Sequence, residues 1–220
     1  MLKVGLTGGM ACGKSVVGEM FLALGAHVIQ SDTVAHQLMQ PGEAVYEEVV
    51  CRFGSAILSP DRTVNRAKLA ESAFGQPPRI AELNSIVHPA VIDFENQWMQ
   101  EIAQRQPHAI AIVEAALILE ASSANRFDRL VVVTCRPEQR VERWATRTNV
   151  DSETARVEVT RRMAAQLPDE EKIKAADYVI DNSGSLDQTR KKVEQIYEKL
   201  RVDEKAFNPK DHKEKPPREA

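Results

Sequence analysis

The chain has 220 residues, of which 43% are hydrophobic, and this suits one α/β domain with inserted subdomains and an apolar core. The formal net charge of −3 argues against a nucleic-acid partner bound through bulk positive charge. No run approaches the ~18 apolar residues that a membrane span needs, so we expect no membrane partner. We expect a cytoplasmic protein, because a strand predicted from the first residues leaves no room for a signal peptide. The three cysteines, at positions 12, 51 and 135, form neither a disulfide framework nor a metal-site spacing.

The first informative stretch lies between residues 3 and 24. Val4 to Leu6 form an apolar run that predicts a buried strand, and apolar residues at helical spacing begin at Val16. Between them, GGMACGKS at residues 8–15 fits G-x-x-x-x-G-K-[ST], the phosphate-binding P-loop motif. The motif therefore stands between a strand and a helix N-terminus, as its function requires. The alternative is a glycine-rich turn that fits the pattern by chance.

Each residue type in this motif has a chemical reason. Gly8 and Gly13 permit backbone angles that a Cβ would forbid, so that successive N–H groups can surround a phosphate. Lys14 brings positive charge to the β- and γ-phosphates, and Ser15 offers a hydroxyl to Mg²⁺. Cys12 lies close to a helix N-terminus, which can lower a thiol's pKa, so it is either reactive toward alkylation or a small filler. The residues expected to contact the nucleotide are Gly8, Gly9, Ala11, Cys12, Gly13, Lys14, Ser15 and Val16.

A second predicted strand, residues 27–30, leads to a candidate catalytic carboxylate. Asp32 follows its carboxyl end, and ligand groups in an open parallel sheet gather at that edge, where the P-loop also lies. Asp32 is therefore a candidate to face the transferred phosphate. Alternatively, Asp32 caps the helix that we expect to run through Met39, and the two roles need not exclude each other.

Residues 41–106 read as a helical block between two strands. We expect helices over residues 44–53, 66–74, 80–86 and 89–104. Such a block is typical of an insertion beside the sheet, and here it would receive the second substrate. Taken alone, His88-Pro89 favours a helix start with proline at its first position.

The third predicted strand, residues 109–113, ends at an acidic residue. Glu114 has the position of a magnesium-orienting carboxylate just past a buried strand. Glu114 and Glu120 flank a leucine-rich turn, and each needs solvent or a partner. The run at 130–134, a leucine followed by four β-branched residues, predicts a fourth strand, buried on both faces.

Residues 126–162 contain nine arginines and no lysine. Arginine suits bidentate contacts to phosphate, and a helix would place Arg136, Arg140, Arg143 and Arg147 on one face. For any single arginine a salt-bridged surface is the simpler interpretation. For the group we favour a mobile lid that supplies charge to a transition state.

The last predicted strand, residues 178–181, ends at Asn182, at the sheet edge where a nucleotide base could rest. An amphipathic helix is expected over residues 186–200, followed by a charged tail that we expect to be disordered. These features predict an α/β P-loop NTPase fold with a five-stranded parallel sheet flanked by helices. Its expected parts are a core (1–40, 107–135 and 166–201), a helical insertion (41–106), a helical lid (136–165) and a tail (202–220).

The chain resembles the dephospho-coenzyme A kinase family, P-loop kinases of nucleotide-kinase type, from about residue 2 to residue 200. The resemblance rests on VGLTGGMACGKS, on SD followed by a helix and PG, on IVHPAV, and on ADYVIDNSGSL. It implies that ATP, with Mg²⁺, donates its γ-phosphate to the 3′-hydroxyl of dephospho-CoA, which gives CoA and ADP in the last step of CoA synthesis. We expect these small molecules as its partners, and a monomer.

The resemblance also implies site residues. It makes Asp32 the base or orienter of the accepting hydroxyl, and it makes Lys14 and Arg140 the charges that act on the phosphates. It places His88-Pro89 in a CoA-binding domain and Asn182 near the adenine of ATP. One departure lies after the third strand, where the family usually has aspartate and this chain has Glu114, whose extra methylene changes its reach toward magnesium.

Three alternative functions can be distinguished from dephospho-CoA phosphorylation. A nucleoside or nucleotide monophosphate kinase would share the loop, lid and fold, and a substrate screen would distinguish it. A non-catalytic module would bind ATP without phosphoryl transfer. A GTPase would need an N-K-x-D guanine signature, which the chain lacks.

Overall fold

The computed structural model describes residues 1–73 and 77–206. The chain divides into two compact units, one of Met1–Val28 with Glu101–Ala220 and one of Ile29–Gln100. Most of the expected tail, residues 207–220, lies outside the described residues. None of the described helices combines the length and apolar character of a membrane-spanning segment.

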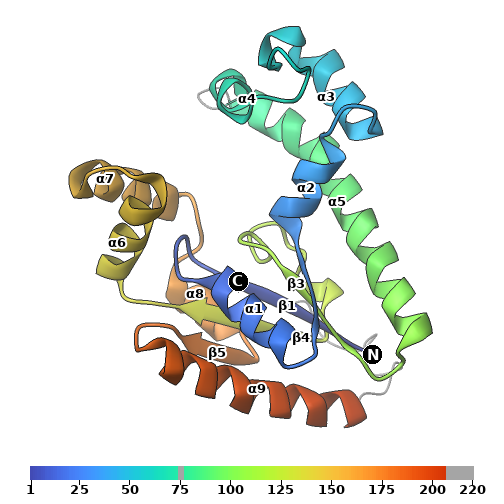
Figure 1. Cartoon of the computed structure of the whole chain (residues 1–220), viewed down its shortest axis with the longest axis vertical. Helices are drawn as coiled ribbons and strands as arrows, with labels where there is room; N and C mark the ends of the chain where they lie inside the picture. The colour runs from blue at the N-terminus through green and yellow to red at the C-terminus, as the bar shows by residue number, and fades with distance from the viewer. Residues whose placement is uncertain (74–76, 207–220) are drawn as a thin grey trace. The chain divides into compact units, whose positions relative to one another are not determined.

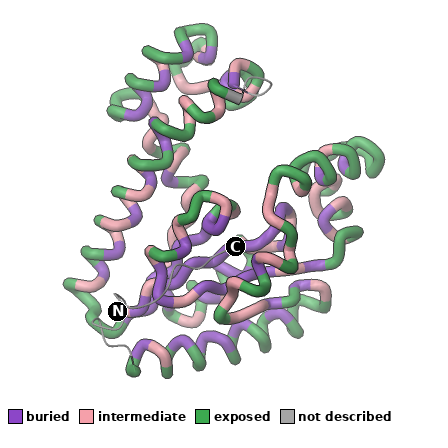
Figure 2. The backbone as a smooth tube through the Cα atoms, turned by 180° about the vertical axis from the view of Figure 1, so that it is seen from behind, coloured by how far each residue is buried: buried purple, intermediate pink, exposed green. Residues whose placement is uncertain are grey.

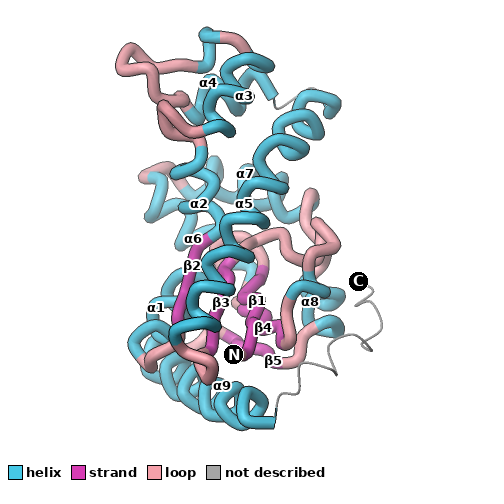
Figure 3. The backbone as a smooth tube through the Cα atoms, turned by 90° about the vertical axis from the view of Figure 1, so that its right-hand side faces the viewer, coloured by secondary structure: helices cyan, strands magenta, loops and turns pink. Residues whose placement is uncertain are grey.

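A five-stranded parallel sheet has the strand order β2-β3-β1-β4-β5 (Figure 1; Figure 3, magenta). Its strands are β1 Leu2–Gly8, β2 His27–Gln30, β3 Ile110–Glu114, β4 Arg129–Thr134 and β5 Tyr178–Asp181. The central strand β1 pairs through Leu6 with Glu114 on one side and Val131 on the other. The predicted sheet is thus confirmed, with a strand at each of the five runs.

The core of the first unit joins the sheet to two helices, α1 Lys14–Ala23 and α9 Leu186–Ala206. Strand β3 is buried along its whole length, as a strand covered on both faces should be (Figure 2). Phe21 of α1 and Val193 of α9 are fully buried in this core. Helix α9 ends at Ala206, beyond the expected end at residue 200, so the first residues assigned to the tail are helical.

Three more helices of this unit lie between β4 and β5 in sequence. They are α6 Pro137–Thr148, α7 Ser152–Ala164 and α8 Asp169–Ala175, and a short 3₁₀ turn, Ala124–Arg126, precedes β4. Helices α6 and α7 occupy the segment predicted as a lid. Trp144 of α6 lies between the guanidinium groups of Arg147 and Arg162, 4.6 and 4.7 Å from its ring centroid, which joins the two helices.

The second unit is almost entirely helical, as predicted. It contains α2 Ser31–Leu38, α3 Ala44–Phe53, a 3₁₀ turn Ser55–Ile57, α4 Arg66–Ala73 and most of α5 Pro77–Arg105. Its own apolar core includes Val34, Val49, Ile57 and Leu69. The predicted last residue of the third helix, Phe74, lies outside the described residues.

The expectation of two helices that meet at Pro89 is wrong. Pro89 lies inside α5, a single helix of 29 residues. Proline breaks the helical hydrogen-bond ladder at one position, but buried Val87 and Val91 keep the helix packed on both sides of it. Tertiary packing therefore overrides the local signal.

Candidate active site

The P-loop connects the end of β1 to the first residue of α1, Lys14. Gly13, the residue before the helix, has a φ of 93°, which agrees with the prediction that this position needs glycine. A Cβ there would lie 2.2 Å from Asn182 Nδ2, so the position also has no room for a side chain. The loop is therefore shaped both by its own backbone and by a residue from the far end of the sequence.

Lys14 and Ser15 begin α1 and face different partners. Lys14 Nζ donates to the carbonyl oxygens of Gly8 and Gly9, at 3.1 and 3.3 Å, so the ammonium group folds back over the loop. Ser15 Oγ donates to Glu114 Oε1 at 2.8 Å. Glu114 is 6% exposed at the end of β3. The two residues predicted to serve the metal are thus in direct contact.

A hydroxyl beside a carboxylate is a suitable oxygen pair for Mg²⁺. This ion keeps several waters and is held by one or two protein oxygens together with substrate phosphates, rather than by a protein cage. The donor set therefore fits a nucleotide-bound Mg²⁺.

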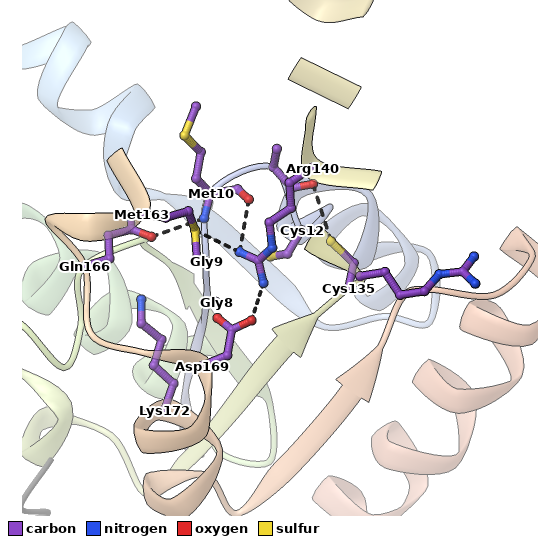
Figure 4. A network of polar contacts seen from close by, with 12 residues as sticks. Gly8, Gly9, Met10, Cys12, Cys135, Arg140, Met163, Gln166, Asp169 and Lys172 are labelled. Atoms are coloured by element: carbon purple, nitrogen blue, oxygen red, sulfur yellow. Dashed lines mark hydrogen bonds and ion pairs between the residues drawn. The ribbon is translucent and has the colours of Figure 1, made fainter. Parts of the chain in front are cut away.

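Arg140 of α6 is buried against the P-loop, only 2% exposed (Figure 4). Its Nη1 donates to the Met10 carbonyl oxygen at 3.2 Å and contacts the Met163 sulfur at 3.2 Å. Its Nη2 forms an ion pair with Asp169 at the start of α8. The sequence predicted lid arginines on one helix face, with a salt-bridged surface as the simpler interpretation of any one of them; Arg136 is exposed, whereas Arg140 is buried.

Arg143 and Asn182 both contact the P-loop through the Cys12 carbonyl oxygen. Arg143 Nη1 and Asn182 Nδ2 both donate to the Cys12 carbonyl oxygen, at 3.0 and 2.8 Å. Asn182 is 4% exposed, and its Oδ1 accepts a hydrogen bond from Thr189 Oγ1 at 2.8 Å. The Asn182 carboxamide therefore forms hydrogen bonds within the protein, to the P-loop and to α9, and its place at the sheet edge did not predict them.

The expectation that the thiol pKa of Cys12 is lowered is wrong. The Cys12 side chain is fully buried, and this burial raises the pKa of its thiol above the ordinary value, although Lys14 and Arg140 act in the opposite direction. Burial likewise raises the pKa of the Cys135 thiol. Desolvation thus outweighs the nearby cations, which favours the alternative that Cys12 is a small filler.

Asp32, His88 and Pro89 belong to the second unit, and all three are exposed. Asp32 stands in the first turn of α2, whose N-cap is Gln30, so the alternative role of Asp32 as the capping residue is wrong. The neighbouring Ser31 Oγ donates to Glu95 Oε1 at 2.5 Å, and Glu95 is 2% exposed. The start of α2 is thus tied to α5 within this unit.

Sequence reasoning missed a group of residues around the start of α8. Gln166 Oε1 accepts the Met10 N–H at 3.2 Å. Glu120 Oε1 accepts the Leu167 N–H at 3.0 Å and lies 2.8 Å from Lys172 Nζ, which is fully buried. Of the two possibilities expected for Glu120, solvent or a partner, the structure shows partners, and they come from a charged stretch that is typical of a solvated surface.

Comparisons with known proteins agree with this geometry. The family model described as dephospho-CoA kinase matches residues 2–188. A dephospho-CoA kinase from Syntrophotalea carbinolica is 38% identical and covers 91% of this chain and 92% of its own length; one from Aquifex aeolicus is 38% identical and covers 92% and 100%. The crystal structure of TT1252 from Thermus thermophilus has a TM-score of 0.74 and 29% identity, and covers 90% of this chain and 97% of its own. The chain therefore belongs to the dephospho-CoA kinase family.

Proposed function

We propose that this protein transfers the γ-phosphate of ATP to the 3′-hydroxyl of dephospho-CoA, which yields CoA and ADP in the last step of CoA biosynthesis. The observation that carries the proposal is the P-loop, with Lys14 bonded to its Gly8 carbonyl and Ser15 bonded to Glu114, in a chain that the family model matches over most of its length. ATP is the donor and dephospho-CoA the acceptor.

The P-loop and α1 bind the phosphates of ATP. The first amides of α1 and the positive end of its dipole favour the anion. Lys14 Nζ, which now donates to Gly8 and Gly9, exchanges these carbonyl oxygens for phosphate oxygens. The phosphoryl transition state is loose, so catalysis consists mostly of positioning and charge stabilisation, which Lys14 and Arg140 supply.

Ser15 and Glu114 serve the magnesium ion. The Ser15 hydroxyl would hold it, and Glu114, which accepts that hydroxyl's hydrogen bond, would orient the hydroxyl or a metal-bound water. When bound, Mg²⁺ neutralises charge on the phosphates.

Asp32 orients the acceptor. Its exposed carboxylate on the first turn of α2 accepts a hydrogen bond from the 3′-hydroxyl, aligns that hydroxyl with the γ-phosphate and takes up its proton. The helical second unit, with His88 and Pro89 on α5, binds the rest of dephospho-CoA. Closure of the lid, α6 with α7, excludes water and so limits ATP hydrolysis.

A coupled assay of ADP release tests the function. We expect release that depends on dephospho-CoA, and no comparable release with nucleosides or nucleoside monophosphates. Release with one of those acceptors instead would identify a different kinase, and ATP binding without transfer to any acceptor would identify a binding module. Size-exclusion chromatography of the same sample tests the expected monomer.

The variant Asp32→Asn tests the mechanism within that function. We expect it to bind ATP normally and to lose about 10²-fold or more in turnover, in line with the usual magnitude of general-base catalysis. Asp93→Asn is the matched control, because Asp93 is also an exposed aspartate on a helix of the second unit. Near-normal turnover in Asp32→Asn would remove Asp32 from the chemistry while leaving the assigned reaction intact.

A further inference from the structure

The starting observation is a buried charge. The guanidinium of Arg140 is 2% exposed, and a charge removed from water requires an anion or a set of polar partners. Its contacts with the Met10 carbonyl and the Met163 sulfur carry no formal charge. Asp169 supplies the anion, and its own side chain is 25% exposed. The carboxylate thus lies at the edge of the buried site.

The pair lies directly on the P-loop. A Cβ added to Gly9 would come within 1.9 Å of Arg140 Nη1 and 3.1 Å of Asp169 Oδ1. Figure 4 shows both side chains converging on this stretch of loop from α6 and α8. Glycine at position 9 is therefore what allows the guanidinium and its carboxylate to approach the loop backbone together.

Contacts made by residues before and after Asp169 in the sequence fix the position of its backbone. Three residues before it, Gln166 accepts the Met10 N–H. Three residues after it, fully buried Lys172 pairs with Glu120 at 2.8 Å. Asp169 is the first residue of α8, so its backbone is also set by the helix. A carboxylate held in this way can fix the direction of a flexible arginine.

We propose that Asp169 is a positioning residue for phosphoryl transfer, which holds the Arg140 guanidinium against the P-loop before ATP binds. This inference rests on the proposed function. Asp169 does not touch the reacting atoms. It restricts the rotamers of Arg140, so that the charge needs no rearrangement when negative charge develops on the phosphates. Without the carboxylate, the guanidinium is buried without an anion and leaves the loop.

Steady-state kinetics of Asp169→Asn test the inference, since this change removes the charge and keeps the shape. We expect kcat to fall about 10–10²-fold, the scale expected for a misplaced catalytic group, while KM for ATP and for dephospho-CoA stays within about threefold. Asp169→Glu, which keeps the charge, should restore part of kcat. Glu171→Gln is the matched control, because it makes the same change on the same helix in an exposed pair with Lys174, and it should leave kcat unchanged.

A double variant separates positioning from folding. If Asp169 acts through Arg140, then Asp169→Asn combined with Arg140→Gln should be no slower than Arg140→Gln alone. Effects that multiply, a normal kcat in Asp169→Asn, or a lowered melting temperature with kcat per folded molecule unchanged, would each overturn the inference. If the unmodified protein transfers phosphate to another acceptor and not to dephospho-CoA, the proposed function is wrong, and the same comparison with that acceptor still decides the role of Asp169.

Discussion

Replacement of Gly13 by alanine tests how the P-loop is held in shape. The substitution has two costs. The first is backbone strain, since φ at Gly13 is 93°, a region that residues with a Cβ rarely adopt. The second is steric, since the new Cβ would lie 2.2 Å from Asn182 Nδ2 and would displace that buried carboxamide.

Gly25→Ala is the matched control, because it carries the first cost without the second. Gly25 belongs to the same unit and has a φ of 98°, but the nearest atom to an added Cβ, Tyr197 Oη, lies at 3.5 Å, an ordinary contact. Strain of about 1–2 kcal/mol, less about 0.4–1 kcal/mol gained from a stiffer unfolded chain, leaves a loss of about 1 kcal/mol in Gly25→Ala.

In Gly13→Ala the displaced Asn182 also loses its hydrogen bonds to the Cys12 carbonyl and from Thr189. Each is worth about 0.5–1.5 kcal/mol, so the total loss should be about 2–4 kcal/mol in the free energy of unfolding. Urea denaturation followed by far-UV circular dichroism measures both variants. Losses that agree within about 0.5 kcal/mol would show that Asn182 does not brace the loop and would refute the reasoning.

Three further predictions concern buried or perturbed groups. At pH 8 an alkylating reagent should modify exposed Cys51 at least about tenfold faster than Cys12, because the Cys12 thiol is buried and its pKa is raised. Peptide mass spectrometry of a time course would measure both rates, and equal rates would contradict this prediction. Burial and the hydrogen bond to Asp203 raise the pKa of Tyr178 to about 12, so its stabilising contribution should persist up to about pH 10 and be lost between about pH 10 and 12. In urea titrations, Tyr178→Phe should therefore reduce the fall in the free energy of unfolding between about pH 10 and 12. An unchanged fall would assign that pH dependence to other groups. Lys172→Met should lower the free energy of unfolding by about 3–5 kcal/mol, because it leaves the Glu120 carboxylate, whose side chain is only 17% exposed, without its cation. A loss under about 1 kcal/mol in urea denaturation would count against this ion pair.

The sheet was predictable because its strands carry a strong local signal. Residues 131–134 are all β-branched and follow buried Leu130, and β4 is found there. The P-loop was equally predictable, since a fixed spacing of Gly8, Gly13 and Lys14 encodes its shape. The contact between Ser15 and Glu114 followed from parallel strands that end at one edge.

The residues around Asp169 could not be predicted, because their partners are distant in sequence. The burial of Arg140 was not predicted, since helical spacing says which residues share a face but not what covers that face. Lys172 lies in a highly charged stretch, DEEKIK at residues 169–174, that resembles a solvated helix, and its burial depends on Glu120, 52 positions earlier. At Pro89 the local signal was strong but wrong: proline predicted a helix start, whereas packing keeps α5 continuous through this residue.

The carbonyl oxygen of Cys12 accepts hydrogen bonds from side chains 131 and 170 positions later in the chain. During synthesis the loop sequence emerges first, Arg143 later and Asn182 later still. A nascent chain that stops before residue 143 would display the complete nucleotide-binding motif without either brace, and one that stops before residue 182 would lack Asn182. We therefore expect the affinity for ATP to be acquired late, as the last strand joins the sheet, which keeps unfinished chains from sequestering nucleotide.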